Sequence, residues 1–183
     1  MRMLPQIPRL SWFVAALLFV CAHAATAADV SEVNRLHRSG DSAQALQLAD
    51  KLLLANPKDA QLLFLKGVVL AETLRNADAI EVFRKMTEDF PELPEPYNNL
   101  AAQHAAMGEY EMARLALEQA IRNNAAYATA HENLGDVYAM LASRAYARAN
   151  ALEPASATLP SKLRLVRELF SAKVSAAPAR PAP

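Results

Sequence analysis

The chain has 183 residues, of which 53% are hydrophobic and only four are glycine. Its 19 basic and 19 acidic residues give a formal net charge of zero at pH 7, which excludes a protein that holds nucleic acid by bulk positive charge. The length suffices for one domain with its own core. The abundance of alanine and the scarcity of glycine favour an all-helical fold.

Residues 1–27 have the pattern of a secretory signal peptide. A short basic lead precedes an apolar run over residues 10–20, and small residues follow it. Residues 25–27 (ATA) fit an A-x-A cleavage site, and residues 22–24 (AHA) offer a second one. A membrane-spanning helix needs about 20 apolar residues, so cleavage is favoured over retention as an anchor. We therefore predict export across the inner membrane and a periplasmic location.

Cys21 is the only cysteine and lies within this segment. Phe19 and Val20 precede it, whereas a lipidated cysteine follows a small residue. Once the segment is removed, the chain holds no thiol for a disulfide or for a thiolate metal site. We predict no cofactor and no metal site.

Landmark residues recur at a fixed step in the part of the chain that follows. The step from Pro57 to Pro91 is the same as the step between successive members of the series Ala45, Ala79 and Ala113. Two such steps separate Gly40 from Gly108, and Gly67 from Gly135. A period of this size, about 34 residues, is typical of stacked helix–turn–helix units.

The same pattern predicts three pairs of helices in chain order. Gly40 is expected to end the first helix by adopting a left-handed conformation. Ser42 and Asn76 are expected to be N-caps, and Pro57 and Pro91 follow the ends of two helices. The predicted pairs are residues 30–39 with 42–55, 59–73 with 76–89, and 95–107 with 110–123.

The fourth unit departs from the period. Two further steps from Pro91 would reach position 159, but the corresponding proline stands earlier, at Pro154. The missing residues fall where a turn is expected, in the run over residues 137–150 that contains no Gly or Pro. We predict one fused helix over residues 128–152, with a tight turn near residues 142–143 as the alternative.

A final helix is predicted over residues 161–173. Its apolar residues Leu163, Val166, Leu169 and Phe170 recur at steps of three and four, which predicts one buried stripe. Such a helix would close the end of a stack. Residues 174–183, rich in Ala and Pro, are predicted to be a disordered tail.

Several of these residues resemble those of the tetratricopeptide repeat family. The family's Asn-Leu-Gly stretch is matched by residues 99–101 (NLA) and 133–135 (NLG). Further matches are the small residue Gly67, the alanines Ala45, Ala79 and Ala113, and the aromatic residues Phe83 and Tyr146. The resemblance covers about residues 29–154, with Leu74 where Gly is usual and Ala125 where Pro is usual.

The resemblance implies an all-α solenoid of helical hairpins. It would hold about three full repeats and a shortened fourth over residues 28–154, with a capping helix over residues 155–173. Small residues at Gly67, Ala101 and Gly135 would let paired helices approach closely.

The resemblance also implies that the first helices of successive repeats line a concave face that binds a peptide or protein. Some relatives hold a terminal carboxylate there with Lys and Asn, but this face carries few basic residues, so a basic or neutral segment is expected. A solvated face without a partner is the alternative. The residues implied are Gln61, Phe64, Val68 and Glu72, then Glu95, Asn98, Asn99, Ala102 and Ala106, then Glu132, Asn133, Asp136 and Met140.

Charge is distributed unevenly along the chain. Residues 28–139 hold 10 basic and 17 acidic residues, a net charge of −7, whereas residues 140–183 hold 7 basic and 2 acidic residues, a net charge of +5. The basic residues near the end would meet an acidic partner or an anionic lipid or polymer, or would simply be the solvated face of the capping helix. They include Arg144, Arg148, Lys162, Arg164 and Arg167.

No arrangement of residues indicates catalysis. His37, His104 and His131 show no H-E-x-x-H or similar spacing, and His104 and His131 are expected to be core residues. We therefore predict a non-catalytic scaffold with a protein or peptide partner, and leave homo-oligomerisation open. The alternative is an assembly element of a bacterial cell-envelope complex that docks through the basic C-terminal helix.

Overall fold

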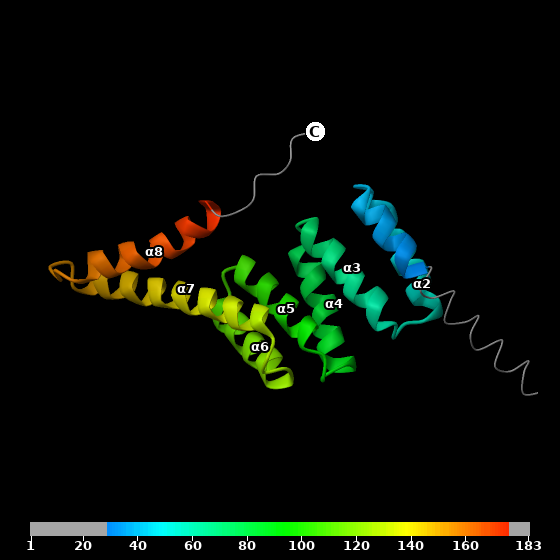
Figure 1. Cartoon of the computed structure of the whole chain (residues 1–183). Coiled ribbons are helices and arrows are strands. Elements are labelled where there is room, and N and C mark those ends of the chain that lie inside the picture. Colours follow the sequence, from blue (N-terminus) through cyan, green and yellow to red (C-terminus); the bar gives the residue numbers. More distant parts are fainter. Residues whose placement is uncertain (1–28, 176–183) are drawn as a thin grey trace, which may run out of the picture. The chain divides into compact units, whose positions relative to one another are not determined.

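The computed structural model describes residues 29–175, and this part of the chain consists of helices joined by short turns and loops, without strands. The predicted signal peptide (1–27) and residues 176–183 of the predicted tail lie outside the described residues. Figure 1 shows the arrangement of the helices. They are a helix over residues 29–38, then α2 (Ser42–Ala55), α3 (Ala60–Glu72), α4 (Asn76–Asp89), α5 (Pro94–Ala106), α6 (Tyr110–Asn123), α7 (Ala128–Leu152) and α8 (Leu159–Ser175).

The helices form two compact units, unit 1 ending at Val82 and unit 2 starting at Phe83. In unit 1, α2 packs against α3. In unit 2, α5 packs on α6, α6 on α7, and α7 on α8, while α5 also contacts α7. The fold is an all-α solenoid of helical hairpins, so the predicted fold class is confirmed.

The turn inside each regular hairpin has one backbone geometry, which recurs at the step of the sequence repeat. Gly40, Leu74 and Gly108 all have positive φ, at +87°, +61° and +76°. In each turn the positive-φ residue donates its N–H to the carbonyl three residues back, and the next N–H reaches five residues back. These two bonds define the Schellman motif, which satisfies the last carbonyls of a helix.

The N-terminal caps differ in part from the prediction. The side chain of Asp41, not that of Ser42, caps α2 by accepting a hydrogen bond of 3.1 Å from the Gln44 N–H. Asn76 is the first residue of α4 rather than its cap. Asp59 caps α3 by accepting from the Leu62 N–H at 3.0 Å. Carboxylates accept strongly and suit the positive end of the helix dipole, which explains the preference for Asp.

Each unit has its own apolar core. In unit 1, Val33 from the first helix, Ala45 and Ala49 from α2, and Leu62 from α3 form a fully or almost fully buried cluster. In unit 2 the buried cluster draws on α5, α6 and α7. Its members are Ala101, Ala113, Ala116, Leu117, Ala120, Ala130 and Val137.

The shortened fourth unit is one continuous helix, as predicted. α7 spans 25 residues, Ala128–Leu152, a length of about 37 Å. Ala142, which stands one repeat step after Gly108, is inside this helix. The first part of α7 contacts α5 and α6 through Ala130 and Val137, and α8 folds back against α7 (Figure 1).

Two predictions about packing and one about a helix boundary are wrong. Gly135 is exposed, and a Cβ added there would meet no atom within 4 Å, so no close helix approach requires glycine at this position. Leu169 is 63% exposed instead of lying in a buried stripe, because Leu163 and Val166 are the half-buried residues on this part of α8. α8 also continues to Ser175, beyond the predicted start of the tail.

Leu74 provides a direct test of the turn geometry. A leucine in the left-handed region is strained by about 1–2 kcal/mol, and this side chain is 84% exposed, so little burial is lost on its removal. We expect Leu74→Gly to raise the free energy of unfolding by up to about 1 kcal/mol, the relief of strain exceeding the entropic cost of glycine. Urea unfolding would measure the change.

Leu54→Gly is the matched control, because Leu54 is equally exposed but lies within α2. There glycine should lower the free energy of unfolding by about 1 kcal/mol. Equal destabilisation by the two substitutions would show that the turn at Leu74 is not strained.

Candidate functional site

The candidate site in unit 2 is the surface formed by α5 and α7, the first helices of two successive repeats. The two helices are in contact. Glu95 and Ala102 on α5 and Glu132 on α7 are exposed, whereas Asp136 and Met140 on α7 are half-buried. We call these five residues the α5–α7 face. They comprise a small residue, three carboxylates and one methionine, all of which were predicted to line the concave face.

A hydrogen bond between two asparagine side chains joins these helices. The Asn133 amide donates a hydrogen bond of 2.9 Å to the side-chain oxygen of Asn98, which is only 7% exposed. Asn99 donates to the carbonyl oxygen of Glu95 on its own helix, at 2.9 Å. Of the residues predicted to line the groove, Asn98 and Asn133 therefore hold α5 against α7.

The negative charge of this surface also acts on a tyrosine. Burial, together with the negative charge of Glu95, raises the pKa of Tyr127, the residue that precedes α7. Glu95, at the start of α5, is therefore close enough to the start of α7 for its charge to act there.

The corresponding surface in unit 1 is carried by α3. Gln61 and Glu72 are exposed, and Phe64 and Val68 are half-buried. Glu72 contacts His37 of the preceding first helix, with 2.7 Å between Oε2 and Nε2. The residues in this pair are 35 positions apart, the same separation as Asn98 and Asn133. In both units, a side-chain contact between successive first helices thus joins residues 35 positions apart.

The histidines do not form a common site. His104 is half-buried and contacts Glu109 at 2.6 Å, whereas the His131 ring lies 3.0 Å from the Ala125 carbonyl oxygen. His131 is exposed, so the prediction that it is a core residue is wrong. Among residues 29–175, no group of three or more His, Cys, Asp or Glu could hold a metal ion.

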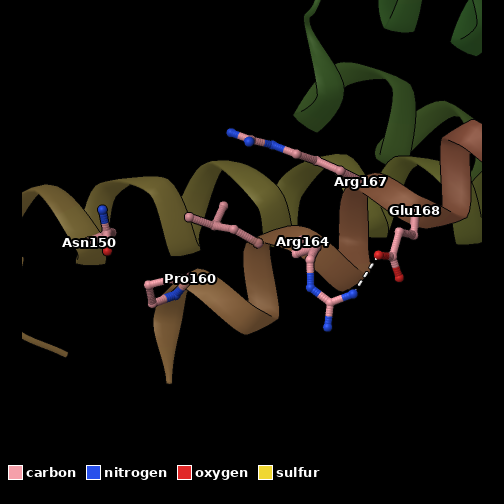
Figure 2. A pocket seen from close by; sticks show the side chains of 6 residues that line it. Asn150, Pro160, Arg164, Arg167 and Glu168 are labelled. Carbon is pink, nitrogen blue, oxygen red and sulfur yellow. Dashed lines mark hydrogen bonds and ion pairs between the residues drawn. The ribbon is translucent and has the colours of Figure 1, made fainter. Parts of the chain in front are cut away.

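A cleft of about 420 Å³ lies between α7 and α8. Figure 2 shows Arg164 and Arg167 projecting from α8 in different directions, with Arg164 beside Glu168 at 2.6 Å. Sequence reasoning noted these arginines as basic residues but missed the cleft, whose only signal was the charge imbalance along the chain. The lining residues are Asn150, Pro160, Leu163, Arg164, Arg167 and Glu168.

A smaller cleft, of about 230 Å³, lies within unit 1 among α2, α3 and the first residues of α4. Two ion pairs occupy its rim, Lys66 with Asp50 and Arg75 with Asp78, each at 2.6 Å. Its charged groups are largely paired with one another, so no ligand chemistry stands out. Within the described range, none of the helices has the length and apolarity that crossing a bilayer requires.

Comparison with known proteins supports the repeat assignment. Residues 31–94 match the family model described as tetratricopeptide repeat. The search of curated proteins gave no match. Many solved structures are similar to this fold, and those of known tetratricopeptide repeat proteins are among them.

Three of these structures illustrate the likeness. The crystal structure of MamA is 26% identical, covers 76% of this chain and 84% of its own, and has a TM-score of 0.58. A thermophilic TPR protein from Thermus thermophilus is 24% identical over 78% of this chain and 81% of its own, with a TM-score of 0.57. The first TPR domain of human RPAP3 is 17% identical over 63% of this chain and 91% of its own, with a TM-score of 0.60.

The last two matches show the fold alone. Residues 31–94 match the tetratricopeptide repeat model, and the solved structures share an α-solenoid fold with the chain. Stacked repeats of this kind present extended surfaces that hold other proteins.

The bond between Asn133 and Asn98 can be tested by substitution. Asn133→Ala leaves the buried oxygen of Asn98 without its donor, which should lower the free energy of unfolding by about 1–3 kcal/mol. Asn99→Ala is the control: its side chain is half-buried and bonds within its own helix, so a change of about 0.5 kcal/mol or less is expected. Chemical unfolding of both variants provides the comparison, and equal small effects would contradict the structural role of Asn133.

Proposed function

We propose that the chain is an exported, non-catalytic scaffold that binds a peptide or protein partner on the α5–α7 face. The observation that carries the proposal is the packing of α5 against α7, with the Asn133–Asn98 bond between them. On this proposal, Glu95, Glu132 and Asp136 belong to one surface that is ordered before a partner arrives. A surface that is already ordered loses less entropy when it binds.

The charge of the face selects the partner. Glu95, Glu132 and Asp136 give it a negative potential, which attracts a basic segment and disfavours an acidic one. Ala102 is small and exposed, and half-buried Met140 offers a soft apolar contact. We therefore propose a segment that carries Lys or Arg next to small or apolar residues. Gln61, Phe64, Val68 and Glu72 on α3 are proposed as the corresponding contact surface of unit 1.

Export is proposed on the pattern of residues 1–27 alone. A basic lead, a short apolar run and small residues before position 28 are the features that support it. The partner would then be a protein of the cell envelope.

Charge reversal on the face is the test of this function. The chain with Glu132→Lys and Asp136→Lys should lose the partner that the unaltered chain captures from an envelope extract, because a negative surface becomes positive. An affinity at least about tenfold lower corresponds to about 1.4 kcal/mol. Titration with the purified partner would measure it, and circular dichroism would show whether the helices persist.

Glu92→Lys with Glu111→Lys is the matched control. Both glutamates are exposed and lie outside the face, in the α4–α5 connection and on α6, and the total change in charge is the same. Equal loss of binding in both double variants would mean that net charge, not the α5–α7 face, governs capture. Retention of full binding by Glu132→Lys with Asp136→Lys would refute the proposed site.

A further inference from the structure

We propose that the cleft between α7 and α8 is a second binding site, which takes an acidic segment of a protein through several carboxylates. This inference goes beyond the α5–α7 face, since it concerns other residues and a ligand of opposite charge. It rests on the shape of the cleft, on its two arginines and on the charge around it.

The lining of the cleft has the composition of a ligand-binding site. This is an open cleft of about 420 Å³, lined by Asn150 of α7, a half-buried amide, and by residues of α8 that include the apolar Pro160 and Leu163. Ligand sites combine an apolar surface with a small number of placed polar groups. The amide of Asn150 can donate to an oxygen acceptor, which suits a carboxylate or a peptide carbonyl.

The arginines define the charge of the ligand. A guanidinium binds a carboxylate through two parallel N–H···O bonds. Arg164 and Arg167 project in different directions from α8 (Figure 2), so they are not arranged to close on one small anion. A segment with two or more carboxylates, such as a run of Glu or Asp, can engage both.

Glu168 does not block the site. It pairs with Arg164 at 2.6 Å, but the two side chains are 54% and 67% exposed, and ion pairs so exposed to water are weak. A ligand carboxylate can therefore replace Glu168 at Arg164. Such an exchange keeps the charge of Arg164 compensated in both the free and the bound state.

The surroundings favour an acidic ligand as well. Residues 140–169 hold five basic and two acidic residues, whereas residues 29–139 hold 10 basic and 17 acidic residues. The positive potential of this end therefore draws acidic segments toward the cleft and away from the α5–α7 face. An anionic membrane would be attracted by every exposed cation of this end, Arg148 included. An acidic segment in the cleft would depend on Arg164 and Arg167, so substitution of Arg148 distinguishes the two ligands.

The test uses the full chain and a short fluorescein-labelled peptide of Glu, Leu and Ala, with a second peptide in which Gln replaces every Glu. Fluorescence anisotropy should show binding of the first peptide and not of the second. Arg164→Gln with Arg167→Gln should weaken binding about tenfold or more, as expected for the loss of charge-assisted hydrogen bonds. These neutral substitutions avoid new acid–acid repulsion along α8, and circular dichroism checks that its helix persists.

Arg122→Gln with Arg148→Gln removes the same charge outside the cleft and should leave the affinity within about twofold, because the exposed cations there act only through a screened field. Equal weakening by both double variants, or equal binding of the Gln peptide, would overturn the proposal. Displacement of the peptide by inorganic phosphate at constant ionic strength would instead identify a small-anion site and overturn it too. So would binding to phosphatidylglycerol vesicles that Arg148→Gln reduces as much as Arg164→Gln does.

The proposals for the two sites can be refuted independently of each other. Glu132→Lys with Asp136→Lys should bind the acidic peptide at least as well as the unaltered chain, since it removes negative charge. A loss of peptide binding in that variant, with its helices intact by circular dichroism, would contradict the charge argument on which the cleft proposal rests.

Discussion

The repeat depends on a buried alanine near the start of each second helix. Ala45, Ala79 and Ala113 are all fully buried and stand one repeat step apart from one another. A methyl group is the largest side chain that leaves two helix backbones so close, and close-packed interiors tolerate extra volume poorly. The positive-φ turns that precede them, at Gly40, Leu74 and Gly108, bring each pair of helices into this contact.

The sequence predicted the helices and turns, which depend on residue spacing within one chain segment. It predicted fewer of the side-chain contacts between segments. The repeat period located the helices and the fused α7, because a turn signal and its absence are both local. Leu74 shows that the turn geometry persists without glycine, since the Schellman bonds compensate for the strain. The Asn98–Asn133 bond was not foreseen: its partners are 35 positions apart, an offset set by the tilt of the packed helices. The packing role predicted for Gly135 failed for the same reason.

α7 links the two proposed binding surfaces. Its first part carries Glu132 and Asp136, next to α5, and its later part contributes Asn150 to the cleft with α8. Arg144 lies over the ring of Tyr110, 4.3 Å from its centroid, an attraction that holds the later part of α7 against α6. The fused helix thus contributes to both proposed surfaces, although the arginines of the second one belong to α8. A scaffold with both can hold two partners, or two segments of one partner, of opposite charge.

The role of the buried alanine is tested most directly by the free energy of unfolding of Ala113→Leu, compared with that of Ala102→Leu at an exposed position. If hairpin packing depends on the buried alanine, Ala113→Leu should cost about 1–3 kcal/mol or more through overpacking. Ala102→Leu should change stability by about 0.5 kcal/mol or less. Equal stability of the two variants would contradict close packing at the repeated alanine.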